Sequence, residues 1–171
     1  MCIRDSLGFE TLSVESGSWT LGSAQSYSSG ALVAAGATLQ LGAAGSLTGP
    51  VTDQGVLAVA HSDALTLSGV SGTGIVAQVG SGTTTLSGNS YSGGTQIYAG
   101  TVDVASAGGA GTGAITFGAG AQTLQIERAA LSGTGSFANT IAGFGTEDTI
   151  DLRGITGASS ATLDPLSLIH I

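Results

Sequence analysis

Short stretches that alternate apolar and polar residues recur along most of this chain, and glycine separates them. Clear copies lie at residues 37–42, 64–69 and 122–127. Alternation with a period of two over four to six residues, bounded by Gly, Ser and Asn, is typical of β-strands. No segment offers ten or more residues at helical spacing with capping residues. The pattern therefore predicts an all-β chain.

The spacing of these stretches favours a solenoid over a sandwich. The pair Leu39/Leu41 recurs as Leu65/Leu67, and Leu67 is followed in turn by Leu86. Such intervals lie near the roughly 20–25 residues that suit one turn of a three-faced β-helix. The Asn-Gly and Asp-Gly dipeptides of two-residue hairpins are missing. We predict a right-handed parallel β-helix (solenoid) over residues 7–163, with about six or seven rungs.

The charge content excludes several classes of function. Charged residues make up 8% of the chain, against about 25% in an ordinary domain. The net charge is −8, and the cations are Arg4, Arg128 and Arg153, with no lysine. Nucleic acid is therefore not expected as a partner, because phosphate binding needs a basic stripe. No run of about 18 apolar residues occurs, so we expect no membrane insertion by this segment.

The two ends differ in texture from the rest. Residues 1–6 and 164–171 lack the glycine-punctuated alternation and resemble translated adapter or assembly scars, so we interpret them as non-native. Setting them aside removes Cys2 and His170 and leaves His61 without cysteine or a second histidine. A zinc site is therefore not expected, and no cofactor is predicted.

Catalysis on a β-helix needs side chains gathered on one face. Polysaccharide-degrading enzymes of this fold cluster carboxylates with Arg or Lys on adjacent rungs, whereas a face of Ser, Thr and Gly favours a structural role. The acids here are interpreted as scattered; only Asp53 and Asp63, with His61 between them, are candidates to converge. We interpret His61 as part of a polar turn between strands at 56–59 and 64–68. No catalytic residue is predicted, and the chain is expected not to be an enzyme.

Residues 82–104 are the most informative segment. They resemble the autotransporter passenger-associated β-strand repeat, whose core is Leu-(Ser/Thr)-Gly-Asn-Asn-(Thr/Ser)-Tyr-(Ser/Thr)-Gly-Gly-Thr, followed by an Ile-x-x-Gly-Thr-Leu strand. This chain lacks one Asn before Ser90 and has Val102 in place of Leu. The positions that carry the resemblance are Leu86, Gly88, Asn89, Tyr91, Gly93, Gly94, Thr95, Ile97 and Gly100.

The resemblance implies a structural, non-catalytic stalk segment of a secreted or surface-displayed bacterial autotransporter or adhesin. It further implies an extracellular location, glycans or proteins of host or environmental surfaces as partners, and a longer chain with a C-terminal outer-membrane barrel. Two alternatives stay open: the non-catalytic part of a β-helical polysaccharide-degrading enzyme, and a calcium-stabilised repeat of a secreted protein.

The calcium alternative depends on residues 139–152. This segment resembles the Ile-x-Gly-Phe-x-x-x-Asp-x-Ile-Asp-Leu strand turn of large repetitive adhesins and calcium-binding secreted repeats. Glu147, Asp148 and Asp151 offer hard oxygen ligands for Ca²⁺. The Gly-Gly-x-Gly-x-Asp nonapeptide of calcium β-rolls is absent, so a solvated acidic turn is the favoured interpretation.

Overall fold

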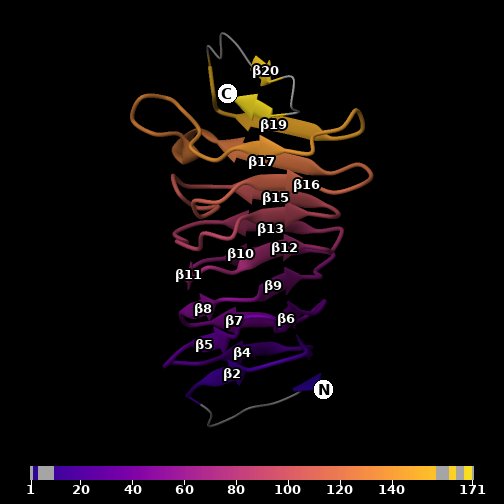
Figure 1. Cartoon of the computed structure of the whole chain (residues 1–171), viewed down its shortest axis with the longest axis vertical. Helices are drawn as coiled ribbons and strands as arrows, with labels where there is room; N and C mark the ends of the chain where they lie inside the picture. The colour runs from indigo at the N-terminus through magenta and orange to yellow at the C-terminus, as the bar shows by residue number, and fades with distance from the viewer. Residues whose placement is uncertain (1, 4–9, 157–161, 165–167, 171) are drawn as a thin grey trace.

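The chain winds as an all-β solenoid of about six turns, with its coils stacked along one axis (Figure 1). The computed structural model describes residues 2–3, 10–156, 162–164 and 168–170. Within these ranges the only helical segment is a 3₁₀ turn, η1 (Arg128–Ala130). The predicted parallel β-helix is confirmed. The parts of it predicted at 7–9 and 157–161 lie outside the described residues.

Each turn of the chain contributes strands to different sheets. The long sheet contains, in spatial order, β1 (Cys2–Ile3), β3 (Ser18–Leu21), β6 (Thr38–Leu41), β9 (Val56–Val59), β12 (Ile75–Gln78), β14 (Thr95–Ile97), β16 (Ile115–Phe117), β18 (Ile141–Ala142), β21 (Leu168–His170) and β20 (Thr162–Asp164). The five-stranded sheet contains β10 (Ala64–Leu67), β13 (Thr83–Leu86), β15 (Thr101–Val104), β17 (Thr123–Glu127) and β19 (Thr149–Arg153).

Two shorter sheets complete the first coils. The four-stranded sheet contains β11 (Val70–Ser71), β8 (Val51–Asp53), β5 (Ala31–Val33) and β2 (Leu12–Val14). The two-stranded sheet contains β4 (Ala24–Ser26) and β7 (Ser46–Thr48). A coil such as β8–β9–β10 therefore has three sides, because each side pairs with the same side of the next coil.

The length of a coil increases toward the C-terminal end. Thr38 pairs with Val56, whereas Ile115 pairs with Ile141 across a longer stretch of chain. The interval from Leu67 to Leu86 does measure one turn, because β10 and β13 pair in that register. The interval from Leu39 to Leu65 does not, because Leu39 lies in β6 of the long sheet and Leu65 in β10 of the five-stranded sheet.

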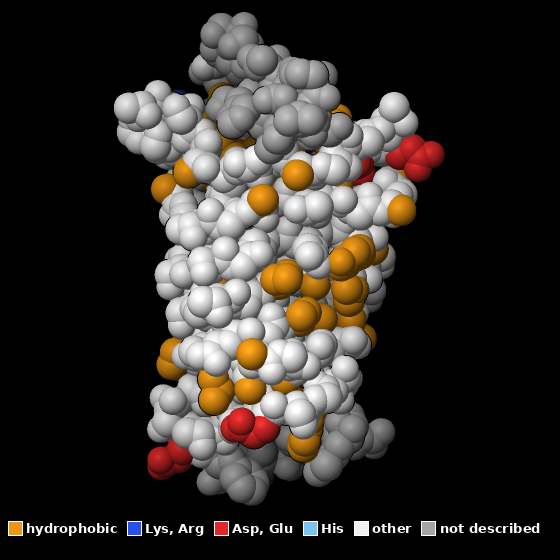
Figure 2. Space-filling view, viewed as in Figure 1, with side chains coloured by type: hydrophobic (Ala, Val, Ile, Leu, Met, Phe, Trp, Pro, Cys, Tyr) orange, Lys and Arg blue, Asp and Glu red, His pale blue; other side chains and the backbone are white. Residues whose placement is uncertain are grey.

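The core is a stack of aliphatic side chains, one layer for each coil. Along the long sheet Leu39, Leu57 and Val76 lie in register and are each at most 1% exposed. Burying one such side chain stabilises the fold by roughly 1.5–3 kcal/mol. The alternation predicted from the sequence exists because strand side chains point alternately inward and outward. Outside, the visible surface carries few charges, and its largest apolar patch lies to the right of centre (Figure 2).

Strands from both terminal segments pair with the solenoid. β1 adds to β3 in parallel, with Cys2 opposite Thr20. At the other end β20 and β21 form an antiparallel pair, and β21 lies beside β18. The predicted division of the chain at residues 6 and 164 stays a prediction.

Candidate functional site: a charged outer face

The outer face of the five-stranded sheet carries two columns of residues in register, and all of them except Ala64 are polar. The first column runs Ala64, Thr83, Thr101, Thr123 and Thr149. The second column runs Thr66, Thr85, Asp103, Gln125 and Asp151. Both columns point outward because the residues between them, such as Val102 and Leu124, are buried in the core. Threonine suits such a face, since its branched side chain packs on the pleated surface of a sheet.

The C-terminal strands of this sheet gather three carboxylates and one guanidinium. Glu127 lies opposite Arg153 in the pairing of β17 with β19. The Nε of Arg153 donates to Asp151 at 3.1 Å, and one of its terminal nitrogens lies 3.8 Å from Oε1 of Glu127. The hydrogen bond to Asp151, followed by the charges of Asp151, Glu127 and Asp103, raises the pKa of Arg153. This arginine therefore stays charged among the acids.

In this cluster, Asp103 has one carboxylate oxygen that accepts a hydrogen bond and one that does not. The hydroxyl of Thr85 donates to its Oδ2 at 3.3 Å. Its Oδ1 is buried and has no hydrogen-bond partner among the described residues. Adjacent strands lie about 4.8 Å apart, so the backbones of Asp103 and Asp151, two strands apart, are separated by about 10 Å.

The interpretation of the acids as scattered is thus wrong for this face. Asp103, Glu127 and Asp151 come from three successive strands and share one side of the solenoid with Arg153. The sequence held a signal, since Thr101-Val102-Asp103 and Thr149-Ile150-Asp151 repeat one pattern. That signal was not sufficient, because the number of residues in the intervening coils decides which positions meet. Carboxylates paired with a cation on adjacent rungs are the arrangement that polysaccharide chemistry uses.

The predicted convergence of Asp53 and Asp63 beside His61 does not occur. Asp53 points into the core and is completely buried, whereas the side chain of Asp63 is 72% exposed. His61 is buried; its Nδ1 lies 2.9 Å from Oδ1 of Asp63, and its Nε2 contacts the carbonyl oxygen of Gly45. The hydrogen bond from His61 lowers the pKa of Asp63. His61 therefore joins two coils at a polar turn, and its position follows the sequence prediction of a turn between β9 and β10.

The calcium candidates lie in two places. Asp148 uses both carboxylate oxygens on backbone N–H groups, accepting from Gln122 at 3.0 Å and from Gly145 at 2.7 Å. Glu147 lines a hollow of about 260 Å³ beside it, while Asp151 lies on β19 against Arg153. Over the described ranges no group of three or more His, Cys, Asp or Glu side chains is arranged to hold a metal ion. Calcium binding here stays a prediction.

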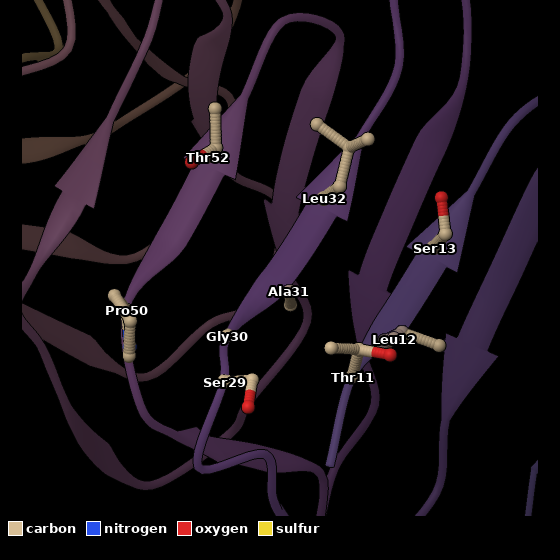
Figure 3. A pocket seen from close by; sticks show the side chains of 9 residues that line it. All are labelled: Thr11, Leu12, Ser13, Ser29, Gly30, Ala31, Leu32, Pro50 and Thr52. Atoms are coloured by element: carbon tan, nitrogen blue, oxygen red, sulfur yellow. The ribbon is translucent and has the colours of Figure 1, made fainter. Parts of the chain in front are cut away.

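A second hollow, of about 340 Å³, lies on the four-stranded sheet near the N-terminal end (Figure 3). Hydroxyl-bearing side chains surround the apolar side chains of Leu32 and Pro50 there. Neither a charged group nor an aromatic ring is among the described residues that line it. We assign it no chemistry.

The repeat segment forms a corner that joins successive coils. Asn89 donates through its amide to the carbonyl oxygens of Leu67 at 3.1 Å and Gly109 at 2.8 Å, and accepts from the N–H of Val70 at 3.0 Å. One buried amide thus satisfies three backbone groups in the coils on either side of it. Its neighbours in the motif Leu86, Thr95 and Ile97 are buried, and Gly88 and Gly100 take positive φ values.

Tyr91 closes the same corner from inside. It is completely buried, and its hydroxyl lies 2.6 Å from the hydroxyl of Thr95. Gly93 and Gly94 follow; Gly94 has a φ of +101°, and a Cβ there would lie 2.6 Å from the carbonyl oxygen of Ala114. Glycine is needed because the next coil passes so close to this turn.

Sequence reasoning overlooked a second copy of this corner. Ser26-Tyr27-Ser28-Ser29-Gly30 matches Ser90-Tyr91-Ser92-Gly93-Gly94, and Tyr27 is also buried. The two copies lie at different corners, since the first leads into β5 of the four-stranded sheet and the second into β14 of the long sheet. Comparing residues 26–30 with residues 90–94 would have revealed the second copy, but not the corner of the coil at which it lies.

Taken together, the stacked coils and buried repeat corners define a parallel β-solenoid of the repeat type. The chain matches the passenger-associated-transport-repeat family at residues 15–41 and 76–104. These two matches are consistent with an autotransporter passenger repeat protein, and the resemblance found in the sequence is confirmed. The chain has no significant match among curated proteins or solved structures. A search of the described residues for an apolar helix of membrane-spanning length finds none.

Proposed function

We propose that this chain is a non-catalytic stalk segment of a bacterial autotransporter passenger or adhesin, secreted or displayed outside the cell. The observation that carries the proposal is the continuous stack of in-register parallel coils that contains two matches to the passenger repeat. Each coil adds about 4.8 Å to the length of the solenoid, so a longer chain gives a longer rod of the same width. A rod of this kind holds a binding element away from the cell surface.

The composition of the core supports the same proposal. Layers of Leu, Val and Ile repeat from coil to coil, and each coil mainly contacts its two neighbours. A solenoid of this type gains stability with each added coil. Its low charge and its surface of Ser, Thr and Gly suit a segment whose role is mechanical.

The complete reading frame around this segment in its source DNA provides the test. The stalk proposal expects further coils with the Tyr91-type corner and a C-terminal export domain. Epitope-tagged full-length protein, expressed in a bacterium with an outer membrane, should then be cleaved by protease added to intact cells. A frame that lacks an export domain and carries more clustered Asp and Arg would overturn it.

A second candidate function rests on the charged outer face. Asp103, Glu127 and Asp151 beside Arg153 are the arrangement that favours a β-helical polysaccharide-degrading enzyme. Glycoside hydrolysis needs two carboxyl groups at a defined separation, and this face supplies three candidates.

The assay for this second candidate is product release from polysaccharides. The chain should be incubated with polygalacturonate, alginate and xylan, and both reducing ends and unsaturated products should be measured. Activity that Asp103→Asn or Asp151→Asn abolishes, and Asp63→Asn leaves unchanged, would establish an enzyme. Absence of products from all three supports the stalk.

A further inference from the structure

Between β3 and β18, the outer face of the long sheet differs from the charged face in having no acidic or basic side chain. Its central outward column runs Thr20, Gln40, Ala58, Ala77, Gln96, Thr116 and Ala142. From β3 to β18 these strands contain no Asp, Glu, Lys, Arg or His. The few charges of the chain thus gather elsewhere, and this side offers nothing to a charged partner.

The middle of this face is apolar. Val56 and Ile75 stand beside the two alanines of the column, and Val79 and Tyr98 follow at the ends of β12 and β14. We call these six residues the tyrosine patch: Val56, Ala58, Ile75, Ala77, Val79 and Tyr98. The exposed apolar surface lies right of centre in Figure 2, at the height of β9 and β12 in Figure 1.

Tyr98 presents a fixed aromatic ring in this patch. The residue is 51% exposed, the larger value of the two exposed large apolar residues in the described part of the chain. The hydroxyl donates to Oε1 of Gln96 at 2.7 Å. The ring also lies against the following coil, where a Cβ on Gly118 would come within 2.9 Å of Cδ1. Two contacts therefore hold the ring in place while half of its surface stays open to solvent.

Gln96 supplies the polar group beside the ring. Its Oε1 accepts from Tyr98, which fixes the amide plane and leaves Nε2 as a hydrogen-bond donor at the edge of the patch. Gln40 lies in the same column on the other side of the two alanines, three strands from Gln96 and thus about 14 Å distant. Between the two amides, Ala58 and Ala77 are only 6% and 3% exposed. Val56 and Ile75 beside them are more exposed, so we interpret the column as a shallow strip between two amide groups.

We propose that the tyrosine patch binds an uncharged glycan. A sugar ring stacks its C–H face on Tyr98, the Nε2 group of Gln96 donates to a ring or hydroxyl oxygen, and the next sugar units lie along the strip toward Gln40. Tyrosine suits this role, since its ring is apolar while its hydroxyl keeps a polar partner. Because no basic side chain stands on this stretch of the sheet, it favours neutral over acidic glycans.

The dimensions of the patch argue against a second copy of the chain as its occupant. A lasting contact between two protein molecules buries about 800 Å² on each partner around a well-packed apolar centre. The two alanines at the centre of this patch expose almost nothing, and within the described residues only Val79 and Tyr98 are large apolar residues with substantial exposure. One ring and two amides are a recognition set on the scale of a short oligosaccharide. The proposal does not depend on whether the chain is a stalk or an enzyme.

Alanine methyl NMR of the full chain tests the proposal directly. Cellohexaose, laminarihexaose, mannohexaose and maltohexaose are the neutral probes, and hexagalacturonate is the acidic comparison. We expect at least one neutral probe to shift the methyl signals of Ala58 and Ala77 and to leave that of the core residue Ala110 unchanged. Tyr98→Ala should weaken the affinity at least tenfold, and Tyr98→Phe, which keeps the ring, no more than about threefold.

The matched control is Thr101→Ala on the five-stranded sheet, which should bind as the unaltered chain does. Three results would overturn the proposal: no shift with any neutral probe, binding that Tyr98→Ala leaves intact, or tighter binding of hexagalacturonate. Sedimentation of the chain without sugar provides the remaining outcome. A dimer that Tyr98→Ala dissociates would assign the patch to a second copy of the chain instead.

Discussion

Asp53 is a carboxylate in an apolar interior, and its burial makes the stability of the solenoid depend on pH. The side chain lies inside β8 with no exposed surface. Its Oδ1 accepts from the N–H of Gly55 at 2.9 Å, but its Oδ2 is buried without a partner among the described residues. Gly74 of the next coil leaves room for it, since a Cβ there would lie 2.4 Å from the carboxyl group. Loss of hydration therefore raises the pKa of Asp53 from 3.8 to about 6, against the opposing hydrogen bonds from Gly55 and Leu57.

The sign of the effect follows from the raised pKa. The folded state holds the proton more tightly than the unfolded chain, so protonation of Asp53 favours folding below pH 4 and this contribution is lost as the pH rises through about 6. A rise of this size in the pKa corresponds to about 3 kcal/mol in full. Between pH 4.5 and 7.5 the free energy of unfolding should fall by about 2 kcal/mol through this residue.

The comparison of the unaltered chain with Asp53→Asn isolates this contribution. Urea unfolding followed by far-UV circular dichroism at several pH values should show a difference between the two proteins that changes by about 2 kcal/mol from pH 4.5 to 7.5, in favour of the asparagine variant at the higher pH. The control is Asp63→Asn, because His61 lowers the pKa of Asp63 and its stabilisation is instead lost as the pH falls. A difference independent of pH, or a ¹³C titration of the Asp53 carboxyl with a midpoint near 4, would refute the reasoning.

Three further outcomes follow from the corners and loops. Gly94→Ala should lower the free energy of unfolding by about 2–3 kcal/mol in a denaturation assay, because φ is +101° and a Cβ would collide with the carbonyl oxygen of Ala114. Gly17→Ala is the control in the same assay, because Gly17 has a positive φ but open space around it, so that only the backbone conformation is tested. Asn89→Ala should cost about 3 kcal/mol, since it leaves three backbone groups unpaired, and hydrogen exchange at Val70 should accelerate. Calcium or EDTA should leave the melting temperature unchanged, because Asp148 already satisfies backbone N–H groups; a calcium-dependent rise would instead support the calcium-stabilised repeat.

Sequence alone determined the strands and their periodicity. Alternation marks which residues of a strand face inward, because the pleat sends neighbours to opposite faces. Leu39, Leu41 and Leu67 are buried as the pattern predicts, and Leu65 is partly buried. The repeat motif marked a corner correctly, since its glycine turn and Tyr91 pack against residues close by in the next coil. These are local or nearest-coil properties, and a short window of sequence carries them.

Tertiary structure alone decided which strands meet. The coils differ in length, as the pairings of Thr38 with Val56 and of Ile115 with Ile141 show, and this variation shifts later strands relative to any fixed period. The path of the chain also places Leu39 and Leu65 on different sheets, leads the corners of Tyr27 and Tyr91 into different sheets, and brings Asp103 and Asp151 onto one face. The face on which a side chain ends is set by the cumulative length of every loop before it, so only the folded chain places the acidic cluster and the tyrosine patch.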